Sequence, residues 1–307
     1  MKGFHPRPGY ASNHPMKMTY APLALATFAL LAGTVPAAET PVAFPAHMIP
    51  GSQLRVLPVN AAGRHYQLSI GLPGNYAKDP DKHYPVVYVT DGYWDFEKLD
   101  AIRGALVFDK VAPEFIIVGL GYAGSNLDYG ALRAWELSPA PFGNDPQTGH
   151  AADFLETIEH EIIPYVEREY RTDPAHRVLG GASLGGLFTL YAMYSKPDLF
   201  SAYVAVTPAV ALNNNWLLDR EEKFTRAGGQ LHGRLFVSMG ENEGAAYLGS
   251  ILLYNKRITS RRYPDLAYQF RIVDGERHAG MQLESYTRGL RFVFAPLAPE
   301  QGPGTFP

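Results

Sequence analysis

The stretch "HRVLGGASLGGLFTLYAMY", His176–Tyr194, places one serine, Ser183, inside a cluster of glycines. A short apolar run at Val178 and Leu179 leads into the cluster, and a helix-forming run leaves it from Leu187. A strand, a G-x-S-x-G turn and a helix in this order form a nucleophile elbow, in which only small residues fit beside the serine. We therefore predict that Ser183 is a nucleophile at a helix N-terminus, where the helix dipole favours a developing anion.

Two other kinds of turn use clustered glycines. A phosphate-binding loop of the Walker type needs a lysine and then a serine or threonine after its last glycine, but Gly186 is followed by Leu187. A turn that merely lets a strand and a helix pack closely is the remaining alternative. The buried-strand pattern before the turn and the helix after it favour the elbow.

A serine nucleophile needs a base, and in this arrangement the acid and the histidine follow the serine along the chain. Beyond Ser183 the sequence holds His232 and His278. His232 precedes a predicted strand, so it would lie at the opposite edge of a parallel sheet. His278 follows the predicted strand 266–273, at the same edge as Ser183, and we predict that it is the base.

The acid should follow the preceding strand, where "RLFVSMGENEG" offers Glu241 and Glu243. The strand is predicted to end near Gly240, and a carboxylate three residues later can turn back toward the imidazole. Glu243 is therefore favoured, with Glu241 as the alternative.

An oxyanion hole needs two backbone N–H donors. We expect the amide of Leu184, which follows the nucleophile, and that of Tyr93 in "VVYVTDGYWDF".

Apolar runs typical of buried strands alternate with helical patterns along the chain, which predicts an α/β fold with a mainly parallel sheet and helices on both faces. The expected strands are 65–73, 86–92, 115–121, 177–181, 202–208, 234–240 and 266–275. Segments 124–149 and 209–229 are expected to be loops over the edge that carries Ser183. Arg133, Trp135 and Trp216 in these loops are candidate substrate contacts.

The N-terminal residues have the pattern of a secretory signal, with Lys17 before an apolar run that ends in small residues. We predict a leader over 1–37, with a true start at Met16 or Met18, a single domain over 38–296 and a disordered tail over 297–307. The mature protein is then periplasmic or secreted and free of the membrane.

The net charge of −3 gives no reason to expect nucleic-acid binding, and the lack of cysteine excludes disulfides and thiolate metal sites.

Two further motifs resemble cofactor or metal sites. "VGLGYAG" contains a G-x-G-x-x-G spacing, but prolines break the segment where a dinucleotide-binding unit needs a long helix. "HEIIP", which begins at His160, starts like a zinc motif and ends in proline instead of the second histidine. We therefore expect neither a cofactor nor a metal.

Taken together, the chain resembles the "Putative esterase" family of α/β-hydrolases, which includes periplasmic trilactone-siderophore esterases, feruloyl esterases, esterase D-like enzymes and mycolyl transferases. The resemblance rests on "YPVVYVTDGYW", "RAWELSPA", "GERHAG" and the segment from "FLETIEHEIIPY" to "AYVAVTPA". It implies an α/β-hydrolase fold, Ser183 and His278 in catalysis and Tyr93 as an oxyanion donor. Thr207-Pro208 stands where the family usually has Ser-Pro. Siderophore esterases of this type can work as a serine–histidine pair, so the resemblance implies roles for Ser183 and His278 but does not require an acid at Glu243.

The expected activity is hydrolysis of a small carboxylic ester through an acyl-enzyme, with siderophore or phenolic esters favoured. An acyl transferase would use the same residues and differ only in the acceptor. A non-catalytic ligand-binding homologue would keep the fold without the chemistry.

Overall fold

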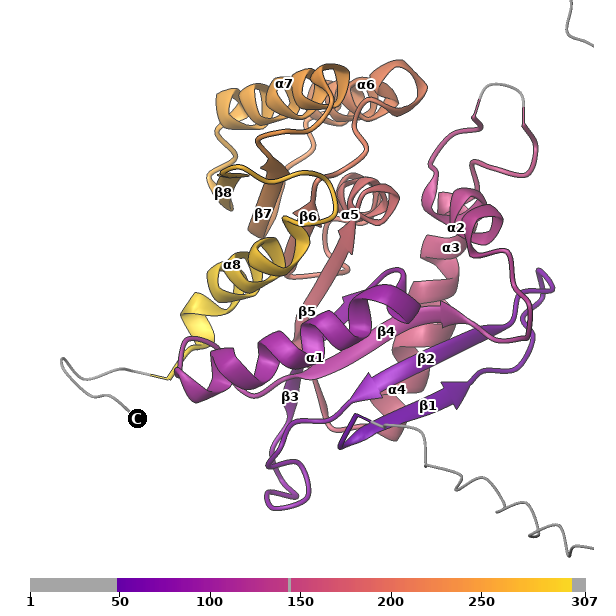
Figure 1. Ribbon diagram of the computed structural model, residues 1–307, viewed down its shortest axis with the longest axis vertical. Helices are drawn as coiled ribbons and strands as arrows, with labels where there is room; N and C mark the ends of the chain where they lie inside the picture. The colour runs from indigo at the N-terminus through magenta and orange to yellow at the C-terminus, as the bar shows by residue number, and fades with distance from the viewer. Residues whose placement is uncertain (1–48, 143–144, 300–307) are drawn as a thin grey trace, which may run out of the picture. The chain divides into compact units, whose positions relative to one another are not determined.

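The computed structural model describes residues 49–142 and 145–299 (Figure 1). The predicted leader and residues 300–307 of the predicted tail lie outside this part of the chain. A single eight-stranded sheet runs through it, in the order β1-β2-β4-β3-β5-β6-β7-β8. The strands are β1 (Ser52–Val56), β2 (Tyr66–Gly71), β3 (Tyr84–Val89), β4 (Ile116–Tyr122), β5 (Thr172–Ala182), β6 (Ala202–Val206), β7 (His232–Gly240) and β8 (Asp265–Val273).

The sheet is mainly parallel, which confirms the predicted fold class. In the order of the sheet, every neighbouring pair from β4 to β8 is parallel. By contrast, β1 and β2 pair antiparallel, and β2 also runs antiparallel to β4. All six residues of β3 are buried, because helices cover both faces of the parallel part. This is why its sequence is a continuous apolar run instead of an alternating one.

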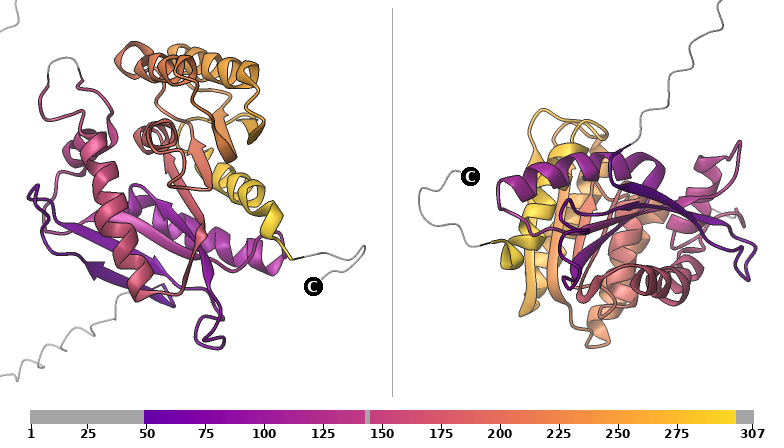
Figure 2. Two further views of the ribbon diagram at one scale, coloured as in Figure 1. Left: turned by 180° about the vertical axis from the view of Figure 1, so that it is seen from behind. Right: turned by 90° about the horizontal axis from the view of Figure 1, so that it is seen from below.

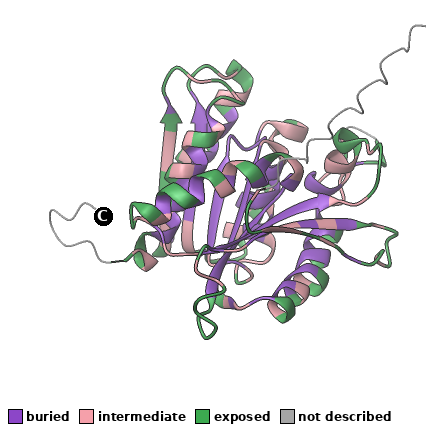
Figure 3. Cartoon of the chain, turned by 60° about the horizontal axis from the view of Figure 1, so that its bottom comes forward, coloured by how far each residue is buried: buried purple, intermediate pink, exposed green. Residues whose placement is uncertain are grey.

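Two helical layers enclose the sheet (Figures 2 and 3). One layer consists of α1 (Gly92–Phe108) and α8 (Gln282–Phe294), whose apolar residues share one buried cluster with Val87 and Phe236. The opposite layer packs against a larger cluster. Its helices are α3 (Ala151–Thr157), the π-helix η1 (Ile158–Ile162), α4 (Ile163–Glu169), α5 (Leu184–Ser195), α6 (Leu212–Arg226) and α7 (Ala245–Arg261). Among the helices of residues 49–142 and 145–299, none combines the length and apolar character needed to cross a membrane.

The two segments expected to be loops are partly helical, so that prediction was wrong in part. The first contains α2 (Tyr129–Leu137), which begins where the Asp128 carboxylate accepts a hydrogen bond from the Ala131 N–H. The prolines that argued against a helix all follow its end. The second contains α6, in which three asparagines directly after Leu212 have left-handed backbones, a conformation that asparagine tolerates.

The C-terminal end of the described chain continues slightly past the predicted domain boundary. A 3-10 turn, η2 (Ala295–Leu297), follows α8, and Leu297 packs against the cluster beneath α1 and α8. The packed structure therefore includes one residue that the sequence had assigned to the tail.

Candidate active site

Ser183 occupies a sharp turn between β5 and α5. Its φ of 60° and ψ of −116° lie in a region that residues with a side chain rarely adopt, at a cost of about 1–3 kcal/mol. Hydrogen bonds hold the turn from both sides: the Ser183 N–H donates to the Val206 carbonyl at 3.0 Å, and its own carbonyl accepts from Ala209 N–H at 3.0 Å. The end of β6 thus fixes the backbone of the predicted nucleophile.

The glycines around Ser183 are required by close backbone approaches. A Cβ on Gly181 would lie 2.5 Å from the Gly185 carbonyl carbon, and one on Gly185 would lie 2.1 Å from the Thr90 hydroxyl. A Cβ on Gly186 would meet the Val206 carbonyl at 2.9 Å. These contacts explain the sequence pattern physically, because any larger residue would push the turn away from its neighbours.

His278 and Glu243 come from two neighbouring loops and meet at this edge of the sheet. His278 lies between β8 and α8, and its Nδ1 is 3.0 Å from Oε2 of Glu243, in the turn after β7. The Glu243 side chain is only 2% exposed, whereas that of His278 is 42% exposed. The alternative acid, Glu241, points elsewhere, and its carboxylate accepts a hydrogen bond from the Gly275 N–H at 2.8 Å.

The surroundings of Glu243 keep it ionised. Burial alone would raise the pKa of this carboxyl group. Hydrogen bonds from His278, the Thr207 hydroxyl and the Gly240 N–H outweigh that effect, so the pKa of Glu243 is lowered. A charged carboxylate next to Nδ1 favours the tautomer that leaves Nε2 free to accept a proton.

Ser183 and His278 line the same cavity, although they are far apart in the sequence. The cavity has a volume of about 150 Å³ and is also bordered by Asp91, Trp94 and Arg133. The expectation that the serine and the histidine lie at one edge of the sheet therefore matches the geometry. Their catalytic roles are taken up under Proposed function.

The two predicted oxyanion donors lie at helix N-termini at this edge. Leu184 is the first residue of α5, and Tyr93 is the second residue of α1. N–H groups in the first turn of a helix have no acceptor within the helix and carry the positive end of its dipole. α1 begins unusually close to β4: a Cβ on Gly92 would lie 2.5 Å from the Gly119 carbonyl carbon. This explains the glycine in "TDGYW".

Arg133, a predicted substrate contact, lines the cavity and also forms an ion pair with Asp91. Its Nε and Nη2 donate to the two carboxylate oxygens of Asp91, each at 2.9 Å. Asp91 is the residue before α1 and has a left-handed backbone, with φ at 53°. Its carboxylate also accepts from the Tyr93 hydroxyl at 3.1 Å. Arg133 therefore ties α2 to the turn that carries the Tyr93 N–H.

A second contact, made by Glu136, also holds α2 in place. The Glu136 carboxyl group is fully buried and accepts a hydrogen bond from the Tyr66 hydroxyl at 2.7 Å. Burial raises its pKa to about 7, although hydrogen bonds from Tyr66 and Tyr122 oppose the rise. Together with the Arg133 pair, this contact fixes α2 over the carboxyl ends of the strands.

The other two predicted substrate contacts do not line the cavity of Ser183. Trp135 stacks on His150, with ring centroids 4.0 Å apart, and the Arg64 guanidinium lies 3.6 Å from the Trp135 ring centroid. Trp216 packs against Tyr191 with centroids 6.1 Å apart. Both indoles are engaged in contacts within the protein.

Several residues that border the cavity were not singled out from the sequence, among them Trp94, Lys98 and Gln282. The Lys98 ammonium donates to Gln282 Oε1 at 2.8 Å, which links α1 to α8. Trp94 is 58% exposed. A helix predicted from Gly92 onward would have placed Trp94 and Lys98 on one face, four residues apart. This spacing is the feature of the sequence from which both residues could have been predicted.

The described residues include one group with metal-ligand geometry, away from this cavity. Glu156, Glu159 and His160 bring potential ligand atoms within 4.8 Å of one another. The Lys196 ammonium contacts both carboxylates, at 2.6 Å in the case of Glu156. A lysine already neutralises this acidic cluster, so it gives no reason to infer a metal.

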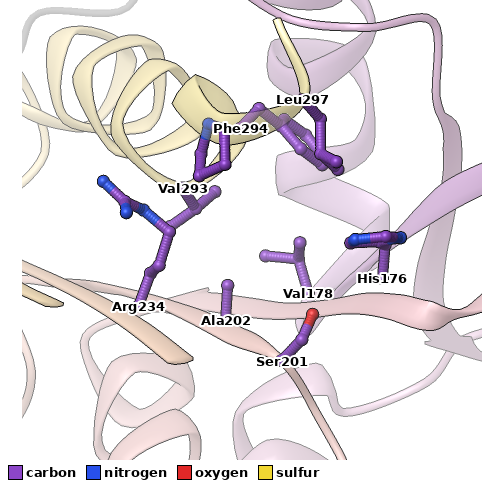
Figure 4. A pocket seen from close by; sticks show the side chains of 9 residues that line it. His176, Val178, Ser201, Ala202, Arg234, Val293, Phe294 and Leu297 are labelled. Carbon is purple, nitrogen blue, oxygen red and sulfur yellow. The ribbon is translucent and has the colours of Figure 1, made fainter. Parts of the chain in front are cut away.

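A second cavity lies at the opposite edge of the sheet, between the strands and α8. It has a volume of about 120 Å³ and contains both a serine and a histidine, Ser201 and His176 (Figure 4). The Ser201 hydroxyl donates to the Arg177 carbonyl at 3.1 Å, and His176 Nδ1 is 2.6 Å from an oxygen of Asp173. This cavity provides an internal comparison for the first.

The fold and the elbow geometry are those of the α/β-hydrolases, and the chain belongs to the "Putative esterase" family, which matches residues 59–246. It is 28% identical to the ferri-bacillibactin esterase BesA of Bacillus subtilis over 276 residues, covering 84% of this chain and 95% of that protein. It is 25% identical to the siderophore enterobactin esterase of Emericella nidulans, covering 63% and 72% of the two chains. The crystal structure of the BES protein from Bacillus cereus superposes with a TM-score of 0.75 at 26% identity, covering 82% and 99%. Family and relatives place the protein among the carboxylic-ester hydrolases.

Proposed function

We propose that the protein is an exported serine esterase that cleaves small carboxylic esters through an acyl-enzyme. The observation that carries this proposal is that Ser183 and His278 line one cavity, with Glu243 bound to Nδ1 of the imidazole. A strained serine at a helix N-terminus, a histidine and a buried carboxylate are the parts that acyl transfer to serine requires.

In the first half-reaction, Nε2 of His278 takes the hydroxyl proton of Ser183 while Oγ attacks the ester carbonyl carbon. The carbonyl oxygen becomes an oxyanion, which accepts hydrogen bonds from the N–H groups of Leu184 and Tyr93. Collapse of the intermediate expels the alcohol, which leaves with the proton from His278. Glu243 stabilises the imidazolium while it exists.

In the second half-reaction, a water molecule gives a proton to His278 and attacks the acyl-enzyme. The carboxylic acid leaves, and the proton returns from His278 to Ser183. The reaction needs only these residues and water. Because the alcohol departs before water attacks, hydrolysis should show an initial burst whenever the second half is slow.

For the substrate we favour siderophore or phenolic esters. One relative, BesA, is named as a ferri-bacillibactin esterase, and the Emericella protein is named as a siderophore enterobactin esterase. The cavity supports an aromatic, electron-rich group, since the exposed Trp94 ring lies at its border and the Arg133 guanidinium is 5.8 Å from the Trp94 ring centroid. Lys98 also borders the cavity, where its ammonium is paired with the Asp95 carboxylate at 2.7 Å. A panel of acetyl, feruloyl and catecholate-lactone esters would rank these classes.

The test of the proposal is Ser183→Ala, with Ser201→Ala as the matched control. Ser183→Ala should lower kcat/KM for p-nitrophenyl acetate by at least about a thousandfold, and a fluorophosphonate probe should label Ser183 in the wild type. Ser201→Ala should keep both activity and labelling. Retained turnover in Ser183→Ala, or labelling elsewhere, would reject the mechanism.

Export rests on the N-terminal sequence pattern. Expressed in a bacterium with its own leader, the protein should appear in the periplasmic or extracellular fraction with an N-terminus near Ala38. A full-length N-terminus in the cytoplasmic fraction would contradict export without affecting the proposed chemistry.

A further inference from the structure

Thr207 stands at the junction between the backbone of the nucleophile and the acid. It follows β6, is fully buried and has a φ of 38°, which is uncommon for a β-branched residue. In the same turn, the Val206 carbonyl accepts from the Ser183 N–H and the Ala209 N–H donates to the Ser183 carbonyl. Such strain persists only where the surroundings fix the backbone, and it gathers at functional sites.

The Thr207 hydroxyl contacts both members of the acid–base pair. Its Oγ1 donates to Oε1 of Glu243 at 2.5 Å and lies 3.3 Å from Nδ1 of His278. The other hydrogen bond to the same carboxylate oxygen comes from the Gly240 N–H at 3.0 Å. With Oε1 held twice, Oε2 is the oxygen that remains for the imidazole.

Thr207 is itself held firmly. Its N–H donates to the Ser238 carbonyl at 2.8 Å, and its carbonyl accepts from the Tyr247 hydroxyl at 3.0 Å. The Tyr247 ring packs edge-on against the His278 imidazole, with centroids 5.3 Å apart at 83°. The methyl group of a threonine also restricts rotation of its hydroxyl about χ1. The donor to Glu243 is therefore fixed in direction.

We propose that Thr207 is a positioning residue that holds the Glu243 carboxylate in the orientation needed by His278, an inference that rests on the proposed esterase function. Without the hydroxyl, Oε1 keeps one donor and the carboxylate gains freedom to rotate. The imidazolium formed during attack then loses part of its stabilisation, and Nε2 is less well aimed at Ser183. The effect falls on the transition state, where the histidine carries charge, more than on substrate binding.

The experiment compares Thr207→Val, which keeps the branched shape and removes the hydroxyl, with Thr207→Ser, which keeps the hydroxyl. Thr207→Val should lower kcat for p-nitrophenyl acetate by about 10- to 100-fold, the effect expected for losing one hydrogen bond to a charged group, with KM changed less than about twofold. Thr207→Ser should stay within about threefold of wild type. Circular dichroism establishes that both variants are folded.

A double-mutant cycle with Glu243→Gln separates positioning from a general structural role. If Thr207 acts through Glu243, Thr207→Val should cost little further activity in the Glu243→Gln background, because the group it orients is already altered. Full activity of Thr207→Val, or an undiminished loss in the Glu243→Gln background, would overturn the inference. Ser183→Ala distinguishes the two proposals: if that variant is inactive while Thr207→Val is fully active, only the positioning role fails.

Discussion

The two cavities differ in more than their residues. Each cavity is lined by a serine and a histidine, which are Ser183 and His278 in the first and Ser201 and His176 in the second. In both cases the histidine also contacts a carboxylate. At the carboxyl edge of the sheet, the serine has a strained backbone and lies between glycines that let the N-terminus of α5 come close to the strands. At the amino edge, the Ser201 hydroxyl is bonded to a backbone carbonyl and its φ is not among the positive ones of the described residues.

This difference teaches that residue type alone does not define a hydrolase site. The histidine that lines each cavity contacts a carboxylate, and the contact at the amino edge, at 2.6 Å, is shorter than the one at the carboxyl edge, at 3.0 Å. Only the carboxyl edge also places helix N-termini beside the serine. In a parallel sheet, the loops after the strands and the helix N-termini meet at that edge, so it is where an anion can be stabilised.

The largest expected effect separates the two histidines. His278→Ala should lower kcat/KM for p-nitrophenyl acetate by about a thousandfold or more, since the base is lost, whereas His176→Ala should change it less than about twofold. Initial rates at pH 7.5 measure both. Equal losses in the two variants would remove the functional distinction between the cavities.

A smaller effect is expected at the acids. Glu243→Gln should reduce kcat by about a hundredfold or more, because an amide no longer stabilises the imidazolium. Glu241→Gln, two residues away and bonded only to a loop N–H, is the matched control and should retain activity. If Glu243→Gln is nearly as active as the wild type, Ser183 and His278 work as a pair without an acid.

The Arg133–Asp91 ion pair at the border of the cavity should have a still smaller influence on turnover. Arg133→Met leaves the buried Asp91 carboxylate unpaired and loosens the turn before Tyr93, so we expect about a tenfold loss in kcat/KM and about 3 kcal/mol less stability. Urea unfolding and esterase rates are the two measurements. Arg234→Met, at the other cavity, should leave the rate unchanged; a comparable loss of rate there would contradict the assignment.

The smallest expected effect is on the stability of the folded protein at acidic pH. The folded-state pKa values of Glu243 and Asp173 are both lowered, burial opposing the hydrogen bonds from their histidines. Their contributions are thus complete above the ordinary values of 4.5 and 3.8 and disappear as the pH falls through the folded-state values. Between pH 5 and pH 3, the urea midpoint of the wild type should fall more steeply than that of Glu243→Gln or Asp173→Asn. Parallel curves would mean that neither pair contributes.

The predictable part of the fold follows from burial. Strands such as β3 and β4 lie between two helical layers, so their sequences are apolar throughout and can be recognised without a structure. β1 was missed because it is an edge strand with exposed residues such as Leu54 and Val56. α2 was missed because nearby prolines hid a short helix that ends before them.

The candidate site, like the fold, has residues that the sequence indicates and residues that only the structure reveals. The sequence indicated Ser183, His278 and Glu243, since an elbow and loops after strands have recognisable patterns. It did not reveal that Trp94 and Lys98 border the cavity or that Trp135 stacks on His150 instead. These outcomes depend on which face of a helix meets which neighbour.

By itself, the sequence determined the sheet class and the serine turn, because these follow from local sterics and periodic burial, and it predicted which residues to propose as the catalytic ones. Only the tertiary structure decided between Glu243 and Glu241 as the partner of His278, paired Arg133 with Asp91 and brought Thr207 onto the carboxylate. Each of these contacts joins segments that are distant along the chain. Their geometry is set by how strands and helices pack together, which no local pattern encodes.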